Sequence, residues 1–244
     1  MTSIGHGNDA SLAGFMAGWD KRFQENEQLP VSVAVIALTN WGERPVPSAH
    51  LAEALGLSVS EVEARAQGHC TIGTPVADPE DTLFRVEDGL ITFKVHFDPE
   101  RPTRRRLRIG GRRVRTTVGC APDVFLYAPL LRPSVQVEES CPVTGTPMRL
   151  VFTPSGVESA DPAGVVVPIP PPKEFDLIGL ERMTPDEADA SCCAQSPFYS
   201  SAKAAQGWLA AHPGGRVFPV REAWDLSFHR VWRDRMSALL NLGD

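Results

Sequence analysis

The chain is organised around the stretch Thr116-Thr117-Val118-Gly119-Cys120-Ala121-Pro122-Asp123-Val124-Phe125. Proline is favoured at the first position of a helix, and Pro122 is followed by the apolar run Val124–Ala128. The pattern predicts a helix that begins just after Cys120, with Asp123 on the same face one turn in. A helix N-terminus stabilises a thiolate and lowers the pKa of a cysteine placed there. A thiolate beside a carboxylic acid can hold a soft electrophile and deliver a proton.

Length and composition indicate a globular protein of one large domain or two small ones. The chain has 244 residues, of which 42% are hydrophobic and 22% charged, and its net charge is −6. This negative balance argues against binding of nucleic acid through bulk charge. No apolar run approaches 18 residues, and no basic segment followed by an apolar core opens the chain. We therefore expect no membrane association and a cytoplasmic location.

The cysteine pattern does not favour a disulfide framework. The five cysteines are Cys70, Cys120, Cys141, Cys192 and Cys193. Their number is odd, two are adjacent, and no export signal precedes them. A buried, inert thiol is the default interpretation of any one free cysteine. The adjacent pair, together with a cysteine at a helix start, weakens that interpretation for the set.

The N-terminal third is predicted to be mostly helical. Apolar residues at helical spacing predict a first helix from Ala10, with a stripe formed by Leu12, Phe15, Met16, Trp19 and Phe23. The run Val31–Leu38 has the propensity of a strand, although a buried helix is equally compatible with its length.

A helix-turn-helix pattern follows. Ser48 is placed to cap a helix that ends at Gly56, and Ser58 or Ser60 is placed to cap a second helix. The segment 82–93 then alternates around an Asp-Gly pair, which predicts a hairpin. Together these elements predict a winged-helix-like module over residues 30–98.

A run of arginines comes next, at positions 101, 104, 105, 106, 108, 112, 113 and 115. A basic run beside a winged helix could contact DNA. However, Glu61 and Glu63 of the second predicted helix would face phosphates unfavourably. Gly110-Gly111 indicates a hairpin or a loop, so we interpret the run as a solvated face and do not expect nucleic-acid binding.

The C-terminal part is predicted to contain a small, mostly antiparallel sheet with flanking helices. The expected strands are 134–138, 148–152, 165–167 and 217–220, with a turn at 141–146. The expected helices are 201–211 and 222–240, and the Pro-rich, then acidic segment 168–190 is expected to be a surface excursion. The fold class is therefore α+β. The expected divisions are an N-terminal helix and tail (1–29), the winged-helix-like module (30–98) and a catalytic α+β domain (99–244).

Familiar catalytic motifs are absent from the sequence. It has no Gly-x-Ser-x-Gly, no phosphate-binding Gly-x-x-x-x-Gly-Lys-Ser/Thr, no His-Glu-x-x-His and no Cys-x-x-Cys. The remaining candidates are Cys120, Asp123 and the pair Cys192-Cys193. Two thiolates from different segments and one carboxylate suit a soft metal ion rather than magnesium or calcium.

These residues carry a resemblance to a known family. The order Cys120-Ala-Pro-Asp123, then Cys141-Pro-Val-Thr-Gly145, then Ser-Cys192-Cys193 resembles the alkylmercury (organomercurial) lyase family. The resemblance extends over about residues 30–240 and implies that Val31–Leu38 is helical. This chain has Gly119 where the family usually has an aromatic residue, and Ala194-Gln195-Ser196 where His and aromatic residues often follow the doublet. These departures bear on the shape of the organic pocket.

The resemblance implies a role for each candidate residue. Cys120 and Cys192 would be the two mercury-binding thiolates, with Cys193 an accessory neighbour. Asp123 would donate the proton to the departing carbon and then bind the mercury product. Cys141 would match a cysteine that looks structural in the family.

The implied reaction is protonolysis of a carbon–mercury bond, which gives a hydrocarbon and Hg(II). No cofactor would be required, since Hg(II) is bound as substrate and product. Small thiols or a mercuric reductase would accept the mercury. Two alternatives remain open: a metal- or thiol-responsive winged-helix DNA-binding protein, and a homologue that binds Hg(II) without cleaving organomercurials.

Overall fold

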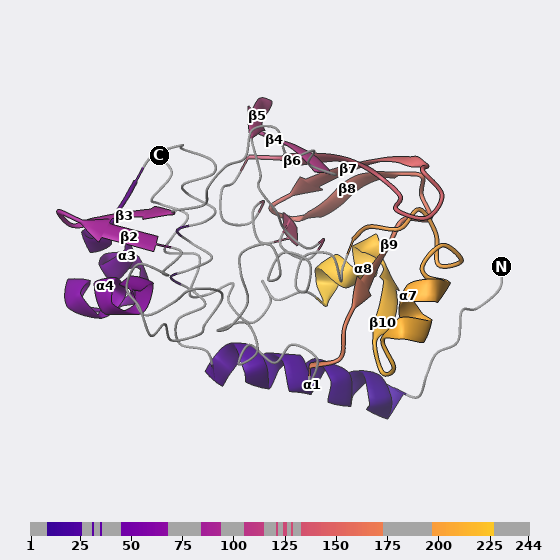
Figure 1. Ribbon diagram of the computed structural model, residues 1–244, viewed down its shortest axis with the longest axis horizontal. Helices are drawn as coiled ribbons and strands as arrows, with labels where there is room; N and C mark the ends of the chain where they lie inside the picture. The colour runs from indigo at the N-terminus through magenta and orange to yellow at the C-terminus, as the bar shows by residue number, and fades with distance from the viewer. Residues whose placement is uncertain are drawn as a thin grey trace.

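The computed structural model describes residues 9–25, 31, 35, 45–67, 84–93, 105–114, 121, 124–125, 128, 133–172 and 197–226. The described part combines α-helices with antiparallel sheets, so the predicted α+β class is confirmed (Figure 1). No helix among these residues is long and apolar enough to cross a membrane.

The first predicted helix is α1 (Asp9–Glu25). Phe15 and Trp19, which lie one turn apart, are both buried, as the apolar stripe predicts. Val31 and Val35 also have helical backbone and are fully buried. Of the two interpretations of that run, helix is therefore correct at these two positions.

A pair of short helices follows strand β1 (Val46–Pro47): α3 (Ser48–Leu55) and α4 (Val59–Gln67). Gly56 ends α3 with φ +65°, a left-handed conformation that glycine adopts without strain. In α4, the Ser58 hydroxyl accepts from the Glu61 amide (3.2 Å), while the Glu61 carboxylate accepts from the Ser58 amide (2.8 Å). This reciprocal capping box confirms Ser58 as the cap.

The prediction that Ser48 caps the N-terminus of α3 is wrong. Ser48 is the first residue of α3, the N-cap position is Pro47, and no side chain of the described residues caps this end. The Ser48 amide instead donates to the carbonyl of Gly89 (2.8 Å), which lies in a distant turn. The helix start is therefore fixed by a tertiary contact, which local sequence does not reveal.

The predicted hairpin is formed by β2 (Phe84–Glu87) and β3 (Leu90–Phe93). Its turn residues Asp88 and Gly89 both have positive φ, 50° and 73°, as a two-residue turn between antiparallel strands requires. β1 pairs with the other edge of β3, giving the strand order β1-β3-β2.

The larger sheet has five antiparallel strands in the order β5-β4-β6-β7-β8. They are β4 (Arg105–Ile109), β5 (Arg112–Val114), β6 (Val135–Ser140), β7 (Pro147–Thr153) and β8 (Gly156–Asp161). The Gly110-Gly111 turn, the strands near 134–138 and 148–152 and the turn after Cys141 agree with the predictions. Strand β8 is not predicted by the sequence pattern.

The remaining elements are β9 (Val166–Ile169), α7 (Gln206–Ala211), β10 (Arg216–Pro219) and α8 (Val220–Asp225). β9 and β10 pair antiparallel. The predicted helix from Ser201 starts only at Gln206, because 202–205 form turns. Strand β10 ends one residue earlier than predicted, and α8 begins at Val220 rather than Glu222. The predicted helix beyond Leu226 lies outside the described residues.

The prediction that residues 168–190 form a surface excursion is wrong for residues 168–171. Residues 168–171 are buried, and the first two of them belong to β9. They lie near α1, where the Trp19 indole donates to the carbonyl of Pro170 (3.1 Å). Pro168 is tolerated because β10 is the only strand that pairs with β9 among the described elements. Residues 173–190 lie outside the described residues.

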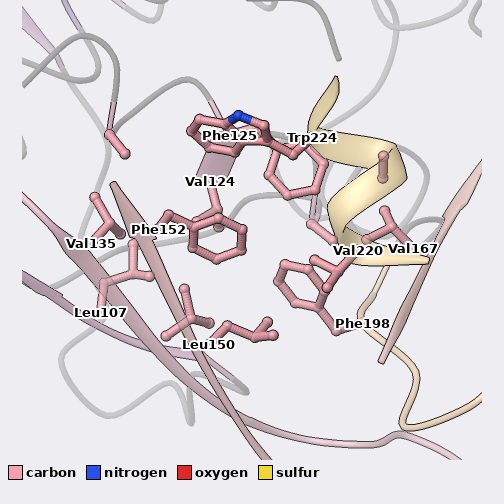
Figure 2. Packing of buried hydrophobic residues seen from close by; sticks show 14 of the residues in the cluster. Leu107, Val124, Phe125, Val135, Leu150, Phe152, Val167, Phe198, Val220 and Trp224 are labelled. Carbon is pink, nitrogen blue, oxygen red and sulfur yellow. The ribbon is translucent and has the colours of Figure 1, made fainter. Parts of the chain in front are cut away.

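The core of the C-terminal part lies between the inner face of the five-stranded sheet and α8 (Figure 2). Alternate residues of β4, β6 and β7 face this core: Leu107, Ile109, Val135, Val137, Leu150 and Phe152. Arg221 of α8 ties the helix to the sheet by donating to the carbonyls of Val157 and Glu158 in β8.

Candidate functional site

The four predicted site residues, Cys120, Asp123, Cys192 and Cys193, lie outside the described residues. The chain on either side of them is described at several positions, and these positions report how the segments that carry the candidate thiols are held.

The segment around the first candidate thiol is helical at each of its described positions. Ala121, Val124, Phe125 and Ala128 have helical backbone, and each is at most 1% exposed. Their spacing of three, four and seven residues places all four on one helical face. The helix predicted after Cys120 is confirmed at these positions, and its buried face packs into the core.

An aromatic cluster links this segment to the one that follows the cysteine doublet. Phe125 contacts Phe152 of β7 (ring centroids 5.5 Å apart), Trp224 of α8 (5.8 Å) and Phe198 (6.4 Å). Figure 2 shows these rings together between the sheet and α8. Phe125 comes two residues after Asp123, and Phe198 comes six residues after Cys192. The two segments with candidate site residues therefore enter the same core cluster, where each ring pair contributes about 0.5–1.5 kcal/mol beyond its buried area.

The chain after the doublet is fixed by hydrogen bonds as well as by packing. Tyr199 forms an isolated antiparallel bridge with Val166 of β9, with N–H to carbonyl distances of 3.0 and 2.9 Å in the two directions. The neighbouring Ser200 hydroxyl lies 3.2 Å from that of Thr144, in the turn after β6. This end of the 173–196 segment is therefore anchored to strand β9 and to the turn between β6 and β7.

The other end of the 173–196 segment is held by α1. The buried indole of Trp19 donates to Pro170, and the ring of Pro172 lies against Gly18. A Cβ atom on Gly18 would lie 3.0 Å from Cγ of Pro172, so glycine permits this close approach. Both ends of the segment that carries the doublet thus join well-packed elements.

A buried ion pair lies beside the aromatic cluster and was missed by sequence reasoning. Arg105 Nε donates to Glu139 Oε2 at 2.7 Å, and the two side chains are 10% and 0% exposed. The Arg105 guanidinium also lies over the ring of Phe198, 5.1 Å from its centroid. Glu139 Oε1 is buried and has no hydrogen-bond partner among the described residues. A signal was present, because period-two alternation places Arg105 on the inward face with Leu107, and Glu139 on the inward face with Val137.

Cys141 is the one cysteine among the described residues, and it is a free, buried thiol. It begins the turn after β6, where its amide donates to the carbonyl of Thr146 (2.9 Å) and its carbonyl accepts from Gly145 (2.9 Å). Burial raises the pKa of the thiol, but hydrogen bonds from the side chain and backbone of Ser200, and then of Thr144, outweigh that effect. The pKa is lowered from 9.0 to about 6.

The role of Cys141 in this arrangement is to connect segments. Its thiol is the acceptor that joins the 141–146 turn to Ser200, which follows the doublet. Its packing and hydrogen bonds agree with a structural thiol. Within the described residues no group of three or more His, Cys, Asp or Glu side chains is placed to hold a metal ion.

Comparison with known proteins gives a family match over the C-terminal part. The family model described as "MerB: Alkylmercury lyase" matches residues 99–231, more than half of the chain. The match includes all four candidate site residues and Cys141.

Several curated relatives are named "Alkylmercury lyase". The protein of Bacillus cereus is 35% identical over 44% of this chain and 44% of its own length. That of Streptomyces lividans is 32% identical over 52% of this chain and 54% of its own length. That of Staphylococcus epidermidis is 29% identical over 76% of this chain and 74% of its own length. The chain thus spans about half the length of the first curated relatives that it matches.

A solved structure shares the fold. The chain described as "Crystal structure of the mercury-bound form of MerB2" aligns with a TM-score of 0.52 and 18% identity, over 91% of this chain and 98% of that one. At this identity the likeness concerns the arrangement of elements, and it extends to both the N-terminal and the C-terminal parts.

Proposed function

Because the chain belongs to the alkylmercury lyase family, we propose that it cleaves the carbon–mercury bond of organomercurials and gives a hydrocarbon and Hg(II). The observation that carries the proposal is the contact between Phe125 and Phe198, with centroids 6.4 Å apart. It brings the chain just after Asp123 into one cluster with the chain that follows the cysteine doublet. A site with thiolates from both segments requires this convergence.

We assign the chemistry to three side chains. Cys120 and Cys192 bind the mercury of the substrate as thiolates, and Asp123 holds the proton that is delivered to carbon. In the cleavage step the carbon–mercury bond breaks and its electron pair forms the new carbon–hydrogen bond. The mercury stays on the two sulfurs, with Asp123 as a further ligand and Cys193 next to the site. Proton delivery by a positioned acid contributes about 10²–10⁴-fold to such a rate.

The partners and conditions follow from this chemistry. The substrate is a small organomercurial, and no cofactor is needed because thiols and an acid complete the reaction. Hg(II) held by two sulfurs leaves by exchange with competing thiols, supplied by a small molecule or by a mercuric reductase. Thiolate chemistry requires a reducing compartment, so the proposed location is the cytoplasm.

Residues 30–98 are proposed to form a winged-helix-like module that precedes the catalytic domain of residues 99–244, with 1–29 as an N-terminal helix and tail. Support comes from the element order β1, α3, α4, β2, β3 and from the sheet order β1-β3-β2. Exposed Glu61 on α4 and exposed Glu87 and Asp88 at the hairpin turn would repel phosphates. We expect no mobility shift of a 30-base-pair duplex at low salt, and a salt-dependent shift would favour the DNA-binding alternative.

Turnover of phenylmercury tests the proposed reaction. The purified protein is incubated with phenylmercuric acetate and excess cysteine, and benzene is measured in the headspace by gas chromatography. Many equivalents of benzene per protein are expected, and a Cys120→Ser variant should release only the uncatalysed background. Benzene at background level with the wild-type protein would show that the chain is not a lyase.

A further inference from the structure

The outer face of the β4–β5 hairpin carries three exposed arginines, Arg106, Arg108 and Arg113. Arg108 and Arg113 are directly opposite each other in the antiparallel register, and Arg106 lies two residues from Arg108 on the same face. Among the described ion pairs none involves these three side chains. Glu138, the cross-strand neighbour of Arg106, lies 3.6 Å from Arg149 instead.

This arrangement is unfavourable within the chain itself. Like charges directly opposite in an antiparallel pair destabilise the sheet. Arg105, the inward-facing neighbour on the same strand, differs from them because its Nε donates to Glu139 Oε2 at 2.7 Å. The outward arginines thus concentrate positive charge on one face of a chain whose net charge is −6.

Protection of a sheet edge does not account for the arginines. Charged side chains on an edge strand discourage pairing with other chains. Only Arg113 is on the edge strand β5, whereas Arg108 is on β4 at a position that pairs with β5 on one side and with β6 on the other. Arg108 therefore lies where edge protection is not needed.

We propose that this face, defined by Arg106, Arg108 and Arg113, is a docking surface for an acidic, extended segment of a partner protein. β5 is an end strand of the five-stranded sheet, and the hairpin lies at the upper margin of the molecule in Figure 1. An extended peptide can add to such an edge through its backbone, while alternate carboxylates reach the arginines. Guanidinium groups bind carboxylates in a paired geometry that lysine does not provide.

The charges elsewhere favour a peptide over nucleic acid. A long polyanion would extend past the three arginines onto a surface that is negative overall, where exposed acidic residues such as Glu61, Glu87 and Asp88 repel it. A short acidic segment needs only the hairpin. The inference goes beyond the proposed carbon–mercury chemistry and does not depend on it.

The probe is a fluorescein-labelled heptapeptide of alternating threonine and glutamate, with binding followed by fluorescence anisotropy at low salt. The test variant combines Arg106→Gln, Arg108→Gln and Arg113→Gln. The matched control combines Arg65→Gln, Arg85→Gln and Lys203→Gln, which removes the same charge from other surfaces. Circular dichroism confirms that both variants are folded. A second peptide has proline at its central threonine and so lacks a backbone donor.

We expect the alternating peptide to bind the wild-type protein and the control variant equally, and the test variant about tenfold or more weakly. The proline peptide should also bind more weakly than its parent. The proposal is overturned if the peptide does not bind, if both triple variants lose affinity equally, or if the proline peptide binds as well as its parent. Tighter binding of a 20-base-pair duplex that depends on the three arginines would assign the surface to nucleic acid instead.

Discussion

At the scale of single residues, the buried pair Arg105–Glu139 lies at the boundary between the sheet and the aromatic cluster. Its two side chains are almost fully removed from water, and the guanidinium covers the Phe198 ring. Buried ion pairs contribute little net stability, but loss of one partner leaves the other charge uncompensated. The pair therefore fixes how Phe198, and the chain that follows the doublet, meet β4 and β6.

Replacement of the cation tests this role. Arg105→Met should lower the free energy of unfolding by about 3–5 kcal/mol, because Glu139 is then buried without a cation. The double variant Arg105→Met/Glu139→Leu should recover most of the loss. Urea unfolding followed by tryptophan fluorescence gives both values. A single variant as stable as the double variant would show that Arg105 does not compensate the buried carboxylate.

Cys141 gives a prediction for the pH dependence of stability. Its pKa in the folded protein is lowered from 9.0 to about 6. Where the folded pKa is depressed, the ionised group stabilises the fold fully above the unfolded pKa, and this contribution is lost as pH falls through the folded value. The stability advantage of wild type over Cys141→Ser should therefore grow between pH 6 and pH 9, by on the order of 2 kcal/mol.

The measurement is urea unfolding of both proteins at half-unit pH intervals under reducing conditions. The other cysteines are the same in both proteins, so they cancel in the difference. A difference that stays constant from pH 6 to pH 9 would contradict thiolate stabilisation by Ser200 and Thr144.

At the scale of elements, α1 packs against residues 170–172, which lead toward the doublet. Gly14 and Gly18 lie on this helix, one turn apart, but within the described part of the chain only Gly18 faces a neighbour, the ring of Pro172. Alanine favours a helix interior over glycine by about 0.5–1 kcal/mol. The two glycines therefore form a matched pair that separates helix propensity from docking.

We expect Gly14→Ala to raise the midpoint of thermal unfolding, because a Cβ atom there meets no described residue within 4 Å. Gly18→Ala should lower it, since the new Cβ would lie 3.0 Å from Pro172 Cγ and would displace α1. Differential scanning calorimetry of the two variants measures the contrast. An equal rise in both would show that α1 does not pack tightly on the Pro-rich segment.

The elements also show where the sequence is informative. The capping box of α4, the Asp-Gly and Gly-Gly hairpins and the helix through Phe15 and Trp19 depend on neighbouring residues, so local patterns predict them. The start of α3 at Ser48 depends on Gly89, about 40 residues away, and the burial of the prolines depends on Trp19, about 150 residues away. Local patterns do not predict either feature. β8 has the weak strand composition Gly-Val-Glu-Ser-Ala-Asp, and its place is set by pairing with β7.

At the scale of the whole molecule, segments far apart in sequence meet around Phe125, Phe152, Phe198 and Trp224 (Figure 2). The candidate thiols and acid could be selected from sequence because their chemistry is unusual and because their order resembles a family. Alternation indicates that Arg105 and Glu139 face inward, but their pairing, like the hydrogen bonds to Cys141, arises only when β4, β6 and the chain near Ser200 are assembled. Phe125 and Phe198, which lie close in sequence to the proposed site residues, contact each other in this core.

In the proposed reaction Asp123 protonates carbon while two thiolates hold the mercury. The most direct measurement compares wild type and Asp123→Ala in a single turnover with phenylmercuric acetate, following benzene by gas chromatography and protein-bound mercury by atomic absorption. One benzene per wild-type protein is expected. For Asp123→Ala we expect retained mercury, with benzene release slowed about 10²-fold or more. Benzene release by Asp123→Ala at the wild-type rate would contradict the assignment of the acid.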